Sequence, residues 1–173
     1  MRIVAGRWRG RIIEAPAGLA VRPTLDRVRE AWMSILQREI PGAKVLDLFS
    51  GSGALGLEAL SRGAVSVDFV ENSAGSLRSL RANIEKLGAE ADSTIHRADA
   101  IKFAGRLAAG DFDIAFADPP YSGGAAVQLA AHWLQVPFSS IFSVEHGAFE
   151  KMPAGGDTRR YGTSAITIYR GGE

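Results

Sequence analysis

From residue 44 onward, the sequence alternates between short apolar segments and longer segments in which apolar residues recur with a helical period. The apolar segments predict β-strands over residues 44–49, 65–71, 93–97, 113–117 and 141–145. The intervening segments predict helices over residues 52–62, 73–87, 100–109 and 124–134. Strands that alternate with helices of this length need crossover connections, so they form a mostly parallel sheet with helices on both faces. With residues 158–161 and 165–170 as a closing antiparallel pair, we expect a doubly wound α/β fold with a seven-stranded sheet.

The length and the composition fit a single globular domain. The chain has 173 residues, of which 46% are hydrophobic and 23% are charged, and both fractions are ordinary for such a domain. The absence of cysteine excludes disulfides and thiolate chemistry, and the three histidines do not have the spacing of metal ligands. No apolar run reaches the roughly 18 residues of a membrane span. We therefore expect a soluble, cytoplasmic, monomeric protein without a metal.

Residues 1–42 precede the alternating region and differ from it in charge. A β-hairpin is predicted over residues 2–14 and an amphipathic helix over residues 24–39. Residues 1–29 carry seven arginines and a net charge of +5, whereas the rest of the chain carries a net charge of −4. A basic segment on a mildly acidic body favours a polyanionic partner, above all nucleic acid. Within the single domain, residues 1–173, we therefore distinguish a basic extension, residues 1–42, from a core, residues 43–173, which we expect to be complete without it.

The predicted nucleic-acid contacts lie in this extension. Arginines bind phosphates, and an aromatic residue set among them can stack on a base. The predicted residues are Arg7, Trp8, Arg9, Arg11, Arg22, Arg27 and Arg29. The alternative is a structural hairpin that covers the sheet, with Trp8 as a packing residue.

The first strand of the alternating region leads into a glycine-rich loop, which runs from Asp47 to Gly56 with the sequence DLFSGSGALG. Its glycines allow a sharp turn and the close approach of a ligand, and Glu71 ends the next strand, where an acidic residue accepts hydrogen bonds from ribose hydroxyls. This pattern fits either NAD or S-adenosylmethionine. Asp47 favours S-adenosylmethionine, because a carboxylate suits its positively charged methionyl end better than it suits a pyrophosphate. Asp99, after the third strand, fits both an acceptor for an adenine amino group and a helix N-cap.

The fourth strand ends in the motif Asp118-Pro119-Pro120-Tyr121. Two prolines make a stiff, extended exit without N–H donors, so the segment offers only acceptors, namely the Asp118 carboxylate and the Pro119 carbonyl. Tyr121 adds a flat ring for stacking. These features suit the binding of the exocyclic amino group of a flipped base, with the nitrogen lone pair directed at a methyl donor.

Several segments resemble a known family. Residues 6–11, 22–31, 45–64 and 118–121 resemble the bacterial 16S rRNA (guanine-966)-N2-methyltransferases, the RsmD family, and the resemblance extends over essentially the whole chain. It implies a Rossmann-like class I methyltransferase fold, S-adenosylmethionine as the cofactor, and methyl transfer to N2 of a specific guanine. It also implies that the partner is 16S rRNA within an assembled or assembling small ribosomal subunit. Residues 1–42 are then an RNA-binding extension beside the catalytic pocket, and residues 43–173 are the catalytic core. One departure is the segment Trp32-Met33-Ser34, where the family has a Leu-Phe-Asn-like run.

The predicted site residues follow from these motifs and from the resemblance. The catalytic residues are Asp118, Pro119, Pro120 and Tyr121. The residues predicted to bind the cofactor are Asp47, Phe49, Ser50, Gly51, Gly53, Glu71, Asn72, Asp99, Ala100 and Asp118. We interpret Trp32 and Trp133 as packing residues and assign no function to Glu145 or His146.

Other functions remain as alternatives. A DNA adenine-N6 methyltransferase could use the same proline motif, but about 170 residues leave little room for a target-recognition domain. A NAD-dependent oxidoreductase explains the glycine loop but not the proline motif. A non-catalytic rRNA-binding assembly factor would share the basic extension but would need neither Glu71 nor Asp118.

Overall fold

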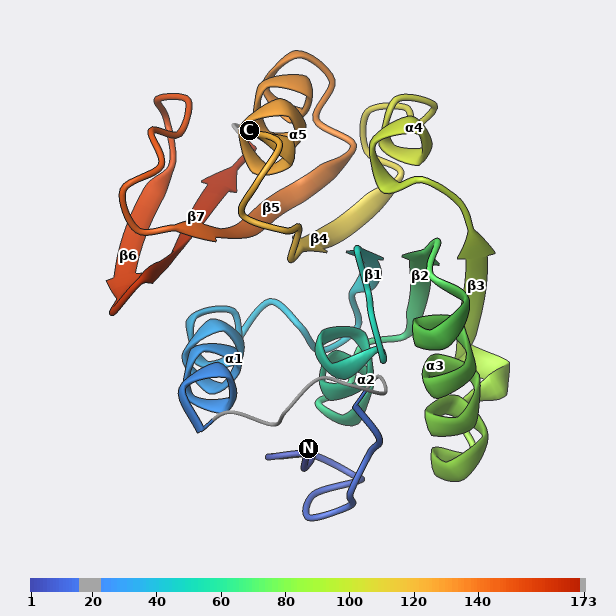
Figure 1. Cartoon of the computed structure of the whole chain (residues 1–173). Coiled ribbons are helices and arrows are strands. Elements are labelled where there is room, and N and C mark those ends of the chain that lie inside the picture. Colours follow the sequence, from blue (N-terminus) through green and yellow to red (C-terminus); the bar gives the residue numbers. More distant parts are fainter. Residues whose placement is uncertain (16–22, 172–173) are drawn as a thin grey trace.

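The computed structural model describes residues 1–15 and 23–171. The strands are β1 (Lys44–Leu48), β2 (Ser66–Glu71), β3 (Ser93–Arg97), β4 (Phe112–Ala117), β5 (Ser139–Gly147), β6 (Asp157–Tyr161) and β7 (Ser164–Arg170). They form one seven-stranded sheet in the order β3-β2-β1-β4-β5-β7-β6 (Figure 1). The first five strands are parallel to one another, and β7 pairs antiparallel with both β5 and β6. The predicted fold class is therefore confirmed.

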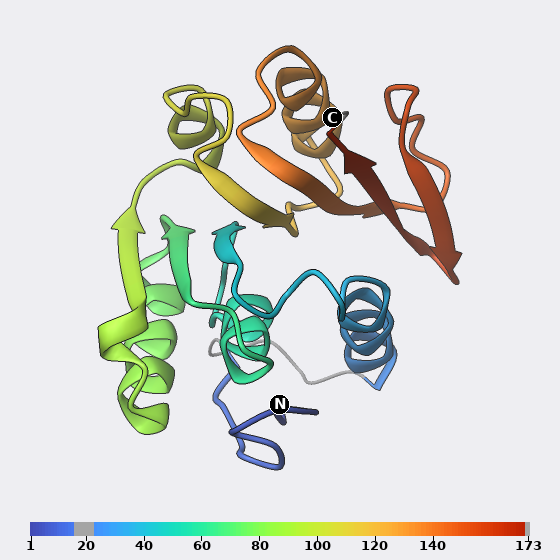
Figure 2. The ribbon, with the colours of Figure 1, turned by 180° about the vertical axis from the view of Figure 1, so that it is seen from behind.

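Helices cover both faces of this sheet. They are α1 (Pro23–Ile35), α2 (Ala54–Ser61), α3 (Ala74–Leu87), α4 (Ala100–Ala104) and α5 (Ala125–Gln135), with a short 3-10 helix, η1 (Glu90–Asp92). Helices α1, α2 and α3 lie on one face and α4 and α5 on the other (Figures 1 and 2). The strand order reverses between β1 and β4, and ligands of doubly wound folds bind at the carboxyl ends of such a strand pair.

Three predicted helices are shorter than expected, each for a local reason. Helix α2 begins at Ala54 rather than at residue 52, because Gly53 has a left-handed φ of 89°. Helix α4 ends at Ala104 rather than at residue 109, and the Asp111 carboxylate then turns the chain by accepting a hydrogen bond from the Ala108 N–H at 2.8 Å. Helix α1 ends at Ile35, and turns carry the chain through residue 39.

The predicted hairpin over residues 2–14 is reduced to a curled loop. One antiparallel bridge joins Arg2 to Ile12, and the Ile3 N–H donates to the Arg11 carbonyl at 2.9 Å. A longer ladder does not form because the tip folds onto the end of α2. Gly6 lies so close to the Ser61 backbone that a side chain at this position would have no room.

This loop is bonded to α2 through a buried carboxylate. Glu58 is 1% exposed and accepts hydrogen bonds from the Val4 N–H at 2.9 Å and the Ala5 N–H at 3.2 Å. Ile3, Trp8 and Ile13 belong to the same hydrophobic cluster as the helices on this face. Residues 1–15 therefore pack as part of the domain rather than as an appended arm.

A single asparagine links the N-terminal segment to the loop after β1. Asn83 on α3 accepts a hydrogen bond from the Glu14 N–H at 2.8 Å and donates to the Glu14 carbonyl at 2.9 Å. The same amide group donates to the Ser52 carbonyl at 3.0 Å. The N-terminal segment is therefore connected to the glycine loop through Asn83.

The two tryptophans interpreted as packing residues are indeed buried. Trp32 packs edge-to-face on Phe116 and donates from its indole N–H to the Ser143 hydroxyl at 2.8 Å. Trp133 is 4% exposed and donates to the Ser139 carbonyl at 2.9 Å. Within the described residues, no helix combines the length and the apolarity needed to cross a membrane.

Candidate active site

The loop after β1 turns sharply at the carboxyl edge of the sheet. Phe49 has a positive φ of 57°, which is rare for a residue with a side chain and concentrates at functional sites. Ser50 donates from its N–H to the Val70 carbonyl at 3.0 Å and so fixes the loop to β2. The turn leaves Gly51 with open space on the side where a Cβ would stand. A ligand can therefore approach the backbone at Gly51.

Asp47 is a buried carboxyl group with one unused oxygen. Its Oδ2 accepts a hydrogen bond from the Gly56 N–H at 3.0 Å, whereas Oδ1 is buried without a partner. Burial raises the pKa of Asp47 to about 8, the Gly56 hydrogen bond opposes that rise, and the charges of Asp118 and Glu71 add to it. A buried polar atom without a partner is costly, and a donor or a cation at Oδ1 would remove that cost.

Glu71, at the end of β2, holds the loop in place through hydrogen bonds to backbone N–H groups. Its Oε1 accepts from the Gly51 N–H at 2.8 Å, and its Oε2 accepts from the N–H groups of Asn72 at 2.9 Å and Ser73 at 2.8 Å. The side chain is only partly buried, so Oε1 keeps a lone pair that can accept from a bound hydroxyl. Glu71 thus orders the loop and still offers an acceptor.

The glycines of the loop have different roles. A Cβ at Gly53 would lie 2.5 Å from the Leu80 side chain, and a Cβ at Gly56 would overlap the Phe69 ring. These two glycines allow α2 to pack closely against the sheet and α3. We had expected Gly53 to clear space for a ligand, but in the structure that role fits only Gly51.

Asp99 caps the helix that follows β3. Its Oδ1 accepts from the Lys102 N–H at 2.9 Å, so the N-cap interpretation is confirmed. Asp99 and Asn72 are both exposed, and Ala100 is buried at the first position of α4. All three residues lie just after a strand, at the carboxyl edge of the sheet. The second carboxylate oxygen of Asp99 can accept a hydrogen bond from a ligand there.

The proline motif leaves β4 beside the glycine loop. The Asp118 N–H bonds to the Leu48 carbonyl at 3.4 Å, so the motif begins next to the end of β1. Pro119 is buried, while Asp118 and Pro120 are exposed and Tyr121 is 48% exposed. Although solvent reaches Asp118, protein surrounds most of its carboxyl group, and this desolvation raises its pKa. Desolvation also raises the pKa of Tyr121, with a smaller contribution from Glu145.

Glu145 is a member of this site that the sequence analysis left without a function. It lies on β5 directly after Val144, which pairs with Ala117 of β4, so Glu145 and Asp118 are neighbours across the sheet. It is 5% exposed, and burial together with Asp118 raises its pKa to about 9. The sequence feature that could have indicated Glu145 is that it is the one charged residue of the predicted strand over residues 141–145, which follows the proline motif in the chain.

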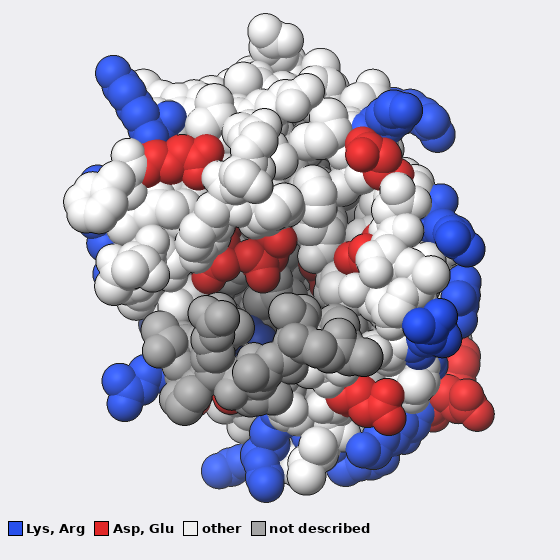
Figure 3. Space-filling view, in the orientation of Figure 1, with Lys and Arg blue, Asp and Glu red and all other residues white. Residues whose placement is uncertain are grey.

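The four carboxyl groups make this edge of the sheet acidic. Asp118 and Glu71 act electrostatically on Asp47, and Glu145 interacts with Asp118. In Figure 3, acidic side chains gather in a central depression, whereas Lys and Arg side chains lie around the rim of this face. Among the described residues, no three His, Asp or Glu side chains are placed to hold a metal ion. The depression therefore suits a cationic ligand and a group that donates hydrogen bonds.

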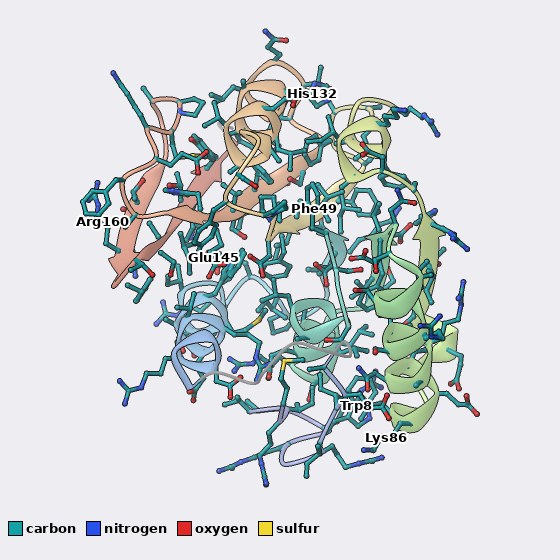
Figure 4. All side chains as sticks on the ribbon, in the orientation of Figure 1. Trp8, Phe49, Lys86, His132, Glu145 and Arg160 are labelled. Atoms are coloured by element: carbon teal, nitrogen blue, oxygen red, sulfur yellow. The ribbon has the colours of Figure 1, made fainter. Side chains whose placement is uncertain are left out.

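Two of the predicted RNA-binding residues, Arg7 and Arg11, lie away from this depression. The Arg7 N–H bonds to the Ser61 carbonyl, the Arg7 guanidinium pairs with Asp92, and Arg11 donates to the Lys86 carbonyl. Ser61, Lys86 and Asp92 lie near the ends of α2, α3 and η1, and from there the chain leads to the start of β2 or β3. The tip of the loop therefore lies at the amino edge of the sheet, opposite Asp118, and Figure 4 shows Trp8 and Lys86 together, away from Glu145. This corrects our expectation that the tip lies beside the catalytic pocket.

Two residues of the predicted RNA-binding set are not available to RNA in this structure. Trp8 is 9% exposed, and the Arg7 guanidinium lies 4.1 Å from its ring centroid, so the ring packs as the structural alternative predicted. Arg29 is 8% exposed and donates to the Arg2 carbonyl at 2.8 Å. Arg9 and Arg27 are exposed on the surface. Arg22 lies outside the described residues.

Comparison with known proteins identifies the family. The family described as "Conserved hypothetical protein 95" matches residues 1–169. The "Putative rRNA methyltransferase YlbH" of Bacillus subtilis is 32% identical over 98% of both chains. The "Ribosomal RNA small subunit methyltransferase D" of Escherichia coli K12 is 39% identical over 124 residues, which are 72% of this chain and 62% of that protein.

A solved structure agrees with this assignment over nearly the whole length. The "Putative methyltransferase yhhF from Escherichia coli" has a TM-score of 0.84 and 32% sequence identity, and the match covers 98% of this chain and 97% of that one. The chain therefore belongs to the conserved hypothetical protein 95 family, the RsmD family of rRNA methyltransferases.

Proposed function

We propose that this protein transfers a methyl group from S-adenosylmethionine to the exocyclic N2 amino group of a specific guanine in 16S rRNA, within an assembled or assembling small ribosomal subunit. The observation that carries the proposal is the position of the segment that begins at Asp118. This segment offers only hydrogen-bond acceptors, and it lies beside the loop that contains Asp47. Membership in a family of rRNA methyltransferases supports the class of substrate. The choice of guanine N2 rests on the family resemblance, because Asp118 could accept from the amino group of other bases as well.

The residues at the carboxyl edge fit the cofactor. Asp47 Oδ1 is a buried acceptor without a partner and suits the positively charged methionyl end. Glu71 Oε1 suits a ribose hydroxyl, and Asp99 and Ala100 suit the adenine. The predicted set is completed by Phe49, Ser50, Gly51, Gly53, Asn72 and Asp118, in which Gly53 acts through packing and Asp118 mainly holds the base. When bound, S-adenosylmethionine supplies the electrophilic methyl group.

The proline motif would hold and orient the base. The Asp118 carboxylate and the Pro119 carbonyl accept the two hydrogens of the amino group, and the prolines offer no N–H that would compete. Tyr121 presents an exposed ring face for base stacking. The methylated nitrogen must lose one proton, and Asp118 can accept it because its raised pKa makes it a stronger base than an ordinary aspartate.

The proposal is tested by methyl transfer to small subunits from a strain that lacks the enzyme. The protein is incubated with labelled cofactor and these subunits, with naked 16S rRNA and with duplex DNA, and the methylated nucleotide is mapped. We expect one guanine of 16S rRNA to carry the label. Label on adenine of DNA, or binding of S-adenosylmethionine without methylation of any rRNA, would contradict the proposal.

Asp118→Ala is the matched inactive variant for this assay. The substitution removes the acceptor for the amino group, and we expect methyl transfer to be abolished. Affinity for S-adenosylmethionine should stay within about tenfold, since the lost hydrogen bonds are made to the base. Calorimetry with the cofactor measures the second quantity.

A further inference from the structure

Two carboxyl groups at the ends of neighbouring strands face each other in the candidate active site. The parallel pairing of Ala117 with Val144 places Asp118 and Glu145 side by side, and their carboxyl groups lie within hydrogen-bonding range. Two carboxyl groups can form a hydrogen bond only when one of them carries a proton. The pair therefore consists of one acid and one carboxylate.

The surroundings decide which member carries the proton. Glu145 is 5% exposed as a whole residue, whereas part of Asp118 reaches solvent, and the contact between the two carboxyl groups lowers the pKa of Asp118 and raises that of Glu145. The neighbour of Glu145 on β7 is the apolar Ile166, and the loop after β4 brings the neutral Tyr121 hydroxyl towards it. Burial and the Asp118 charge raise the pKa of Glu145 to about 9.

The next polar side chain along β5 is held elsewhere. His146, the next residue on β5, is 1% exposed and bonds to the Gly147 carbonyl and the Thr167 hydroxyl. Figure 4 shows Glu145 within the molecule, close to β5 and β7. Among the described residues, the charge that acts on Glu145 is that of Asp118.

We propose that Glu145 is a positioning residue, which in its protonated form donates a hydrogen bond to Asp118 and holds the Asp118 carboxylate ionised and oriented towards the amino group. This inference rests on the proposed function, in which Asp118 binds that amino group. One Asp118 oxygen is then fixed by Glu145, and the other is directed at the base. Ionisation of Glu145 would place two negative charges side by side and displace the Asp118 carboxylate.

Two substitutions separate the hydrogen bond from the charge. Glu145→Gln keeps a donor of similar shape but cannot ionise, so kcat at neutral pH should fall by less than about fivefold. Glu145→Leu removes the donor and should lower kcat by about ten- to a hundredfold. Thermal melting and cofactor affinity, both measured for each variant, show whether the fold and the cofactor site persist.

The pH dependence of kcat gives a result that a merely structural role would not. Wild-type activity should fall as the pH rises through about 9, where Glu145 ionises, whereas Glu145→Gln should keep its activity there. Titration of the guanine itself affects both enzymes equally and cancels in the comparison. An identical alkaline decline in both enzymes, or full activity of a folded Glu145→Leu protein, would overturn the inference.

Infrared spectroscopy tests the pair without any RNA substrate. At neutral pH, the wild-type spectrum minus the Glu145→Gln spectrum should contain the carbonyl band of one protonated carboxylic acid. If that band is present but no rRNA is methylated, the proposed function fails while the protonated pair stands. If methylation occurs but the band is missing, the inference about Glu145 is the one that is wrong.

Discussion

Asp47 is the residue whose environment departs most from that of an ordinary aspartate. Because its pKa is raised to about 8, the folded protein keeps a proton that the unfolded chain releases near pH 4. The bound proton stabilises the folded protein fully below about pH 4, and this stabilisation is lost as the pH rises from about 4 to about 8. A cation bound at Oδ1 would favour the ionised form, so binding of S-adenosylmethionine near pH 7 should release a proton. Calorimetry in two buffers of different ionisation enthalpy measures this release, and Asp47→Asn should eliminate it.

Glu71 has a structural and a binding role at once, and its substitution should affect both. Glu71→Ala removes the acceptor of three backbone N–H groups and the proposed ribose contact. We expect a loss of about 1.5–3 kcal/mol in S-adenosylmethionine affinity, the scale of a hydrogen bond to a charged group, together with a lower melting temperature. Unchanged affinity in calorimetry would show that the ribose is held by other residues.

At the scale of elements, the packing of α2 depends on the missing side chains of Gly53 and Gly56. Gly53→Ala places a Cβ 2.5 Å from Leu80 in a left-handed backbone and should lower the free energy of unfolding by about 2–4 kcal/mol. Gly51→Ala meets open space and should cost only the left-handed conformation, about 1–2 kcal/mol. Denaturant unfolding of both variants measures the difference. Equal losses would show that α2 and α3 adjust without cost.

The order of the elements follows from the sequence because short strand segments rich in apolar residues alternate with longer segments of helical period. The five parallel strands lie where the sequence predicts them, and Asp47, Glu71 and Asp118 all lie at the carboxyl edge. Contacts between distant segments could not be predicted in the same way. The Asp118–Glu145 pair depends on the register of β4 against β5, and the position of the N-terminal loop depends on Glu58 and Asn83, whose partners lie 53 to 69 residues away.

At the scale of the whole molecule, the N-terminal segment and the cofactor loop form one unit. Deletion of residues 1–14 leaves Glu58 buried without the Val4 and Ala5 N–H groups and leaves Asn83 without Glu14. We expect the truncated protein to lose thermal stability and to bind S-adenosylmethionine more weakly, since Asn83 also holds the Ser52 carbonyl. Retention of both properties would show that residues 43–173 are a complete core after all. Glu14→Ala is the matched control, because its contacts with Asn83 are made by its backbone.

Binding of the ribosomal subunit would involve both edges of the sheet. The base would enter at the carboxyl edge, whereas Arg9 and Arg11 lie on the loop at the opposite edge, so RNA that contacts both must extend along the protein. Arg9 is exposed and can be changed without disturbing the packing, unlike Arg7, which covers Trp8. Arg9→Ala combined with Arg11→Ala should weaken subunit binding. It should also reduce the slope of log K against log[salt] by about 0.7–0.9 for each phosphate that the variant no longer binds.

Arg38→Ala is the matched control for charge, because Arg38 is exposed and lies outside the predicted RNA-binding set. It should leave the slope unchanged, and both proteins should keep the melting temperature of the wild type. If the double variant binds subunits with the wild-type slope, the N-terminal loop supports the fold alone, and the RNA must be held by other basic residues, such as those around the edge of the face shown in Figure 3.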